Sequence, residues 1–395
     1  MRFPATGLLR AVLLLAPLVL CACGGGGGSG SSTASGGGNG SDGNTLPPPP
    51  PRGGDTPRFA YVANFVDGTV SLYTVNPTTG ELRNNGIAAA GRGPTSVAVD
   101  PSGKFVYVAN QDSDDVSAFK INNQSGALTA VLGSPFDAGA GPFCVTVDPS
   151  GRFVYVANRG FSDVSAFVIS ASSGALTPVA GSPFPSGANP AYVAVDPSGT
   201  FAYVTNQDSA NLLPDKIDTV SAFKINNKSG ALTPVLGSPF PAGANPTSMT
   251  VDPSGRFAYV ANVLSNNVSA FTIDATGALN ALGPPVAGLV SPASVTVDPS
   301  GRFTYVANRD SANVSAFTID GTGGLNAVAG SPFSTGMGPF SVTVDPSGKF
   351  AYTTNQSSNT VSSFTIDATG ALTPKGTPVQ AGKGPVSLAV TKGSP

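Results

Sequence analysis

The chain has 395 residues, of which 50 are glycine and 36 are proline, and only 11% are charged. Its formal net charge of −2 excludes a nucleic-acid binder that works through bulk positive charge. The chain contains no histidine, so histidine-dependent triads, histidine-ligated metals and imidazole acid–base chemistry are excluded as well. All but one of the 22 acidic residues are Asp, which favours turns, so we expect a turn-rich chain with few helices.

Residues 1–22 have the pattern of a signal peptide. Arg2 and Arg10 precede the apolar run AVLLLAPLVL, which is about half the length of a membrane-spanning helix. The run ends in Leu-Cys-Ala-Cys, which resembles the lipobox of bacterial lipoproteins with Cys23 as the lipidated residue. This resemblance implies a lipid-anchored protein of the bacterial cell envelope, in the outer membrane, that meets the membrane only through its anchor. An ordinary cleaved signal peptide is the alternative.

Residues 23–57 read as a flexible tether. They are rich in Gly and Ser, hold almost no apolar side chains, and end in the stiffer segment Pro47–Pro51. After processing, the chain keeps only Cys23 and Cys144. Because Cys23 would be acylated, we expect no intramolecular disulfide.

The region 58–395 is built from one repeated unit. The tetrapeptide YVAN, or a close variant, occurs seven times, beginning at Tyr61, Tyr107, Tyr155, Tyr203, Tyr259, Tyr305 and Tyr352. Each full unit predicts four short strands with a D-P-S-G turn between the first and the second. In the first full unit these strands are Ser96–Asp100, Lys104–Asn110, Val116–Ile121 and Gly126–Val131.

The strand pattern predicts an all-β, seven-bladed propeller. Both faces of Lys104–Asn110 are apolar, so each sheet needs a neighbour on both sides, as in sheets stacked around an axis. The region starts with a strand of the second type, Arg58–Asn64, and ends with a strand of the first type, Val386–Thr391. We therefore expect the C-terminal strand to complete the first blade and close a ring of four-stranded blades. A linear stack of the same sheets is the alternative.

The repeated unit resembles a known family. YVAN followed by VSAF, with SVAVDPSG before it, is similar to the YVTN-type repeat, and Tyr203–Asn206 reads YVTN. That group resembles the lactonase-like seven-bladed propellers, which include 6-phosphogluconolactonases. The resemblance covers Arg58–Thr391 and implies a propeller fold and sugar-lactone hydrolysis as one activity. No stretch matches a catalytic motif, so the catalytic residues are unknown.

Residues that recur in every blade are expected to be structural. We expect the Asn that ends each YVAN to close a turn in the left-handed region, and the Asp of D-P-S-G to accept turn hydrogen bonds. Cys144 and Tyr192 stand where most other units have Ser. Cys144 is expected to pack as a small residue, whereas Tyr192 either reaches the channel or packs beside it.

Function is expected where the repeats differ, on the rim formed by the loops between second and third strands. These loops carry more acidic than basic residues, and the longest is Gln207–Thr219. The pairs Arg159 with Asp163 and Arg309 with Asp310 could supply the carboxylate and the cation that lactone hydrolysis needs. The candidate ligand rim consists of Arg159, Asp163, Asp208, Asp215, Asp218, Arg309 and Asp310. Because Asp112–Asp115 lacks the spacing of a calcium loop, we predict no metal site. No cofactor is expected either.

The leading functional hypothesis is a lipid-anchored propeller that binds or scaffolds a partner, either an unknown protein or a small carbohydrate-like ligand. A sugar-lactone hydrolase and a purely structural surface protein are the alternatives, and nucleic acid is not an expected partner. The uneven, charged loops favour the first two hypotheses. Since the rim is acidic and histidine is absent, we expect little hydrolysis of 6-phosphogluconolactone.

Overall fold

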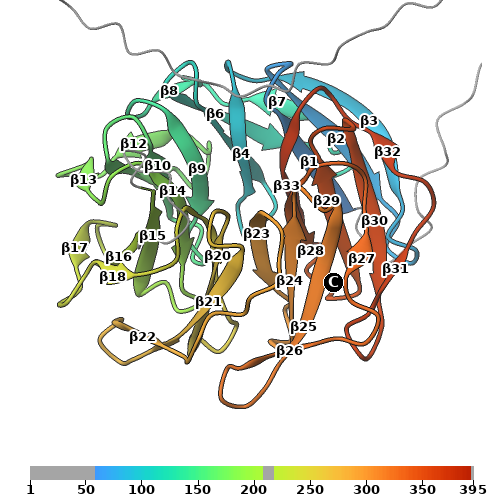
Figure 1. Cartoon of the computed structure of the whole chain (residues 1–395). Coiled ribbons are helices and arrows are strands. Elements are labelled where there is room, and N and C mark those ends of the chain that lie inside the picture. Colours follow the sequence, from blue (N-terminus) through green and yellow to red (C-terminus); the bar gives the residue numbers. More distant parts are fainter. Residues whose placement is uncertain (1–57, 208–217, 393–395) are drawn as a thin grey trace, which may run out of the picture. The chain divides into compact units, whose positions relative to one another are not determined.

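Every regular element among the described residues is a β-strand. The computed structural model of the protein describes residues 58–207 and 218–392. The strands form seven antiparallel sheets, numbered here as blades 1 to 7 in the chain order of their second strands (Figure 1). No described segment forms a helix that could cross a membrane. The predicted signal peptide (1–22), Cys23 and the rest of the tether (23–57) lie outside the described residues and remain predictions.

The innermost strand of each blade borders a central channel, and these seven strands contact one another in a closed circle. Each begins with proline, which suits the first residue of an edge strand because its nitrogen cannot donate to a ladder. In blade order they are β33 (Pro385–Val390), β4 (Pro94–Val99), β9 (Pro142–Val147), β14 (Pro190–Val195), β19 (Pro246–Val251), β23 (Pro292–Val297) and β28 (Pro339–Val344).

The second strand of each blade holds the core. Nearly all its side chains are buried, because each blade packs a neighbour against both of its faces. These strands are β1 (Arg58–Asn64), β5 (Phe105–Asn110), β10 (Phe153–Asn158), β15 (Phe201–Asn206), β20 (Phe257–Asn262), β24 (Phe303–Asn308) and β29 (Phe350–Asn355).

The third strand of each blade pairs with the second along its whole length. Its second to fifth residues are nearly all buried, and its sixth residue is partly or fully exposed. These strands are β2 (Thr69–Val75), β6 (Asp115–Ile121), β11 (Asp163–Ile169), β16 (Thr219–Ile225), β21 (Asn267–Ile273), β25 (Asn313–Ile319) and β30 (Thr360–Ile366).

The outer strand is shorter than the sequence predicts and is split in five blades. Blade 1 has the continuous strand β3 (Leu82–Ala89), and blade 5 has β22 (Leu279–Ala281) alone. In blade 2 the chain leaves the sheet at Ser134, whose Oγ accepts the Ala118 N–H at 2.9 Å, and then pairs again. The split strands are β7 (Leu128–Ala130) with β8 (Phe136–Asp137), β12 (Leu176–Pro178) with β13 (Phe184–Pro185), β17 (Leu232–Pro234) with β18 (Phe240–Pro241), β26 (Leu325–Ala327) with β27 (Phe333–Ser334), and β31 (Leu372–Pro374) with β32 (Val379–Gln380).

One tyrosine in each blade ties it to the next. The hydroxyl of Tyr155 donates to the Gly230 carbonyl of blade 4 at 3.0 Å, and each of the other six YVAN tyrosines makes the equivalent bond. Gly230 has a φ of +79°, and a Cβ there would lie 2.4 Å from the ring of Phe153. This position therefore requires glycine on both counts.

The repeated Asn and Asp residues are structural, as predicted, although the Asn residues act differently from the expectation. Asn158 is fully buried at the end of its strand, and its φ is not among the positive values that occur in the described chain. Its amide donates to Ser165 Oγ of the third strand at 2.8 Å, and the other six do the same. Asp148 accepts the N–H groups of Arg152 and Phe153, as a turn acceptor should.

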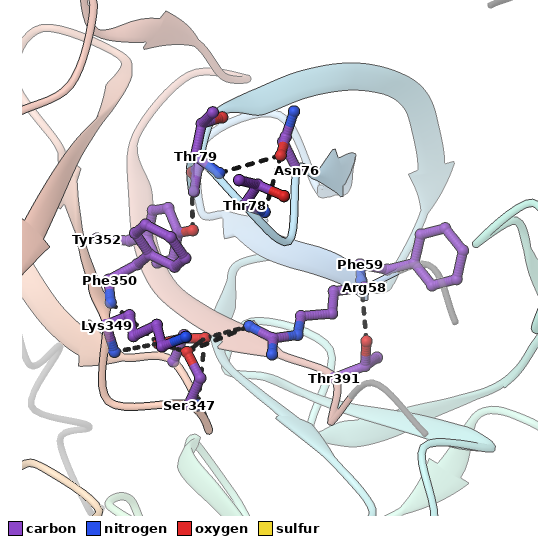
Figure 2. A network of polar contacts seen from close by, with 12 residues as sticks. Arg58, Phe59, Asn76, Thr78, Thr79, Ser347, Lys349, Phe350, Tyr352 and Thr391 are labelled. Carbon is purple, nitrogen blue, oxygen red and sulfur yellow. Dashed lines mark hydrogen bonds and ion pairs between the residues drawn. The ribbon is translucent and has the colours of Figure 1, made fainter. Parts of the chain in front are cut away.

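The C-terminal strand closes the ring, as predicted. β33 pairs antiparallel with β1, so the two ends of the propeller region share blade 1. Here Thr391 takes the place of the turn Asp of the other blades, and its Oγ1 accepts the Phe59 N–H at 2.9 Å (Figure 2). Arg58 forms an ion pair with the buried carboxylate of Asp345 in blade 7. The ring is therefore closed by a strand, a hydroxyl and an ion pair.

Candidate functional site

A cavity of about 400 Å³ lies among the innermost strands. This volume falls in the range of ordinary small-molecule sites. Backbone, aliphatic side chains and hydroxyl groups line it, and none of the described lining residues carries a carboxylate, an ammonium or a guanidinium. The cavity is therefore uncharged, with a lining that is partly polar and partly apolar.

Serine hydroxyls bridge the innermost strands around this cavity. Ser96 Oγ accepts the Val145 N–H of the next blade at 3.1 Å, and Ser387 accepts the Val97 N–H at 3.1 Å. Ser248 and Ser294 make the equivalent bonds. These hydroxyls satisfy N–H groups on sheet edges that would otherwise face the channel unpaired.

Blades 3 and 4 interrupt this pattern. Cys144 and Tyr192 occupy the Ser position there, and both line the cavity. Burial raises the pKa of the Cys144 thiol, so it is protonated and a poor nucleophile. Burial and the nearby Cys144 raise the pKa of Tyr192 well above its usual value, so its phenol is neutral and can donate a hydrogen bond. Tyr192 thus combines the two predicted alternatives, because it lines the cavity and also packs against the core beside it.

Arg159 contacts the lining of the cavity in the same sector, although it is not itself a lining residue. Its guanidinium stacks on the ring of Phe143, a lining residue at the start of β9, with 5.0 Å between Cζ and the ring centroid. Its Nη2 donates to Gln207 Oε1 at 2.8 Å. Burial lowers the pKa of Arg159, but a guanidinium keeps its charge at neutral pH.

Arg159 has no ion-pair partner among the described residues. The described residues form two ion pairs, Arg58 with Asp345 and Arg309 with Asp310, and neither includes Arg159. Its partners are a neutral amide and an aromatic face. Such a group is suited to bind an anion or to stabilise negative charge that develops on a substrate.

Two of the predicted rim carboxylates hold loops together. Asp163 accepts the side-chain amide of Asn158 at 2.7 Å, and no ion pair joins it to Arg159. Asp218 accepts the backbone N–H of Asn245 at 2.8 Å, which links blade 4 to the entry of blade 5. The other two predicted acids of the long loop, Asp208 and Asp215, lie outside the described residues.

Arg309 and Asp310 do come together, but in an exposed position. Arg309 Nε lies 3.0 Å from Asp310 Oδ1, and their side chains are 40% and 53% exposed. Partial burial would raise the pKa of Asp310, but hydrogen bonds from Ser291 and Arg309 outweigh it and hold the pKa below its usual value. The pair is a neutralised surface contact and a weak base.

Sequence reasoning missed two contributors to this site, Phe143 and Gln207. Phe143 follows the first proline of its blade, where four other blades have Thr or Ala and blade 7 has Phe340, so the sequence shows two aromatic residues at this position of the repeat. Gln207 was noted only as the start of the long loop. Among the described residues, no group of three acidic or cysteine side chains could hold a metal ion.

Comparison with known proteins shows which protein family the sequence matches. The sequence matches the family described as "Lactonase, 7-bladed beta-propeller" over residues 55–147, 131–217 and 212–389. It is 32% identical over 81 residues to a 6-phosphogluconolactonase of Bacillus subtilis, a stretch that covers 19% of this chain and 23% of that relative. The chain thus matches less than a quarter of the length of that relative.

Solved structures share the fold. A protein of Bacteroides fragilis superposes with a TM-score of 0.75 at 24% identity, over 87% of this chain and 100% of that one. The periplasmic gluconolactonase PpgL of Pseudomonas aeruginosa superposes with a TM-score of 0.73 at 20% identity, over 85% of this chain and 99% of that one.

Proposed function

The chain belongs to the lactonase family of seven-bladed β-propellers, and on this basis we propose that it hydrolyses a sugar lactone at the edge of its central cavity. The observation that carries the proposal is the guanidinium of Arg159, which has no ion-pair partner among the described residues and stacks on Phe143 of an uncharged cavity lined partly by hydroxyl groups. A sugar lactone is itself uncharged and rich in hydroxyls, and its carbonyl oxygen gains negative charge during hydrolysis.

The reaction needs few groups from the protein. Water attacks the carbonyl carbon and gives up a proton, the ring C–O bond breaks, and the ring oxygen takes up that proton to give a hydroxy acid. Arg159 stabilises the oxyanion that forms after attack, and it then faces the carboxylate of the product. Tyr192, neutral and directed to the cavity, donates a hydrogen bond to a substrate oxygen.

Relatives named for lactone hydrolysis favour this activity over the binding scaffold that the sequence alone puts first. Within the family, we propose an unphosphorylated aldonolactone as the substrate. The described lining of the cavity offers no cation for a phosphate dianion, and Arg159 is a single charge at its edge. This agrees with the expectation of little activity on 6-phosphogluconolactone.

The test compares two arginines at equivalent positions of their blades. Full-length protein should hydrolyse D-glucono-δ-lactone faster than the spontaneous reaction, and Arg159→Ala should lower kcat/KM by about 10²–10³-fold. Arg309→Ala should change it by less than about twofold, because Arg309 is exposed and its charge is already neutralised by Asp310.

Initial rates would be measured by titration of the released acid, with 6-phosphogluconolactone as the second substrate. Equal rates for the wild type and Arg159→Ala, or no rate above the spontaneous one, would contradict the proposed function.

A further inference from the structure

Gln207 is more deeply buried than the residues at the same position of the other blades. It directly follows the buried Asn that ends the second strand of blade 4, and it is only 2% exposed. The residues at this position in the other six blades are all partly exposed. In chain order they are Phe65, Gln111, Arg159, Val263, Arg309 and Gln356.

Both ends of the Gln207 amide are used. Its Nε2 donates to the Pro246 carbonyl of blade 5 at 3.2 Å, and its Oε1 accepts from Arg159 at 2.8 Å. A carbonyl can only accept a hydrogen bond, so the contact with Pro246 fixes which end of the amide faces the guanidinium. Gln207 thus connects blades 3, 4 and 5 and presents one neutral acceptor to Arg159.

Because the Gln207 oxygen is a neutral acceptor, it leaves the positive charge of Arg159 available to a ligand. Glu has nearly the shape of Gln, and at position 207 it would pair with Arg159 as a carboxylate and cancel its charge. From this geometry we infer that Gln207 is a positioning residue that holds the Arg159 guanidinium over Phe143 and preserves its charge for a carboxylate ligand. The ligand class is an aldonate, the hydroxy acid that opening of a sugar lactone produces.

The lactone part of this inference rests on the proposed function, whereas the charge preference can be measured without catalysis. Full-length protein would be titrated calorimetrically with sodium D-gluconate and with D-glucitol, its uncharged analogue. The wild type should bind gluconate at least about tenfold more tightly than glucitol, as expected of a charge-assisted contact.

The decisive variant is Gln207→Glu, with Gln356→Glu as the matched control. Gln207→Glu should weaken gluconate binding by about 10–100-fold and bring the gluconate-to-glucitol preference close to one. Gln356→Glu, at the same position of blade 7, should keep the wild-type preference. In an Arg159→Ala background, Gln207→Glu should cause no further loss, because it acts through that guanidinium.

Thermal melting establishes that each variant is folded. If Gln207→Glu does not fold, Gln207→Met, neutral and of similar shape, replaces it and should weaken gluconate binding by about three- to tenfold while leaving glucitol unchanged. An unchanged preference in the position-207 variant, an equal loss of both ligands, or no gluconate binding by the wild type would overturn the inference.

The proposed lactone hydrolysis and the positioning role of Gln207 can be contradicted independently of each other. Gluconate binding that depends on Gln207, without lactone hydrolysis, would overturn the proposed function and support this inference. Hydrolysis that is unaffected in kcat and KM by Gln207→Glu would overturn this inference alone.

Discussion

Thr391 performs with one hydroxyl the task that an Asp performs in the other six blades. In blade 2 the Asp100 carboxylate accepts the N–H of Phe105 at 2.7 Å. Blade 1 joins the two ends of the propeller region and has no D-P-S-G turn, so the Phe59 N–H donates to Thr391 Oγ1 instead. Thr391 is 3% exposed, so water cannot replace this acceptor easily.

Loss of this hydroxyl should therefore destabilise the ring. We expect Thr391→Ala to lower the free energy of unfolding by about 1–3 kcal/mol, because it leaves the buried Phe59 N–H unpaired. Thr391→Asp should recover most of the loss, since Asp serves in the other blades. Urea denaturation measures the effect, with Thr365→Ala on an exposed strand end as the control. A Thr391→Ala protein as stable as the control variant would show that the strand pairing alone closes the ring.

At the scale of strands, the repeat allowed most of the fold to be predicted. The strand Lys104–Asn110 is predicted by a run of residues that is apolar on both faces, and β5 begins one residue later at Phe105. The pairing of β33 with β1 followed from the unmatched strand types at the two ends of the repeat region. Patterns of this kind are informative because burial on both faces constrains nearly every side chain of a blade.

The outer strands were predicted less well. Gly126–Val131 was expected as one strand, but β7 is shorter and a second piece, β8, follows it. At this split the side chain of Ser134 accepts the Ala118 N–H, and the serine of the recurring G-S-P-F segment does the same in blades 3, 4 and 6. This contact between neighbouring strands is not revealed by the alternation of apolar and polar residues from which the strand was predicted.

The candidate site was predicted only in part for a similar reason. Arg159 could be identified as a charge on an uneven loop. Its isolation from Asp163 depends on the Asn158 amide, which engages that carboxylate, and its position depends on Phe143 and Gln207 from neighbouring strands. Contacts between residues on different strands of the ring are set by the fold and not by local spacing.

At the scale of the whole molecule, buried tyrosines make the stability of the ring depend on pH in the alkaline range. The chain has nine tyrosines, and burial raises the pKa of every one of them, that of Tyr73 to about 12. Eight of them donate hydrogen bonds between blades, seven from the YVAN tyrosines and one from Tyr73 to the Gln380 carbonyl. The unfolded chain would ionise near the ordinary tyrosine pKa of 10.0, and the folded protein ionises later.

The free energy of unfolding should therefore keep its full value below about pH 10 and fall steeply above it. The reason is that only the unfolded chain releases its tyrosine protons there. Each tyrosine contributes about 1.4 kcal/mol per pH unit in this window, so nine together contribute about 12 kcal/mol per pH unit, comparable to a whole domain's stability. We expect cooperative unfolding within about one pH unit above pH 10.

Tyrosinate absorbance and circular dichroism, recorded in one titration, should change together. Gradual tyrosinate formation near pH 10 with an unchanged dichroism spectrum would contradict the buried, blade-linking tyrosines.

We propose that one sector of an otherwise regular ring, around Arg159 and Tyr192, recognises a sugar acid or its lactone. The most direct measurement is a crystal structure of the full chain with D-gluconate bound. We predict the gluconate carboxylate within hydrogen-bond distance of the Arg159 guanidinium, and its hydroxyls in the cavity beside Tyr192. Gluconate bound at the Arg309–Asp310 pair, or elsewhere with Arg159 free, would contradict the account.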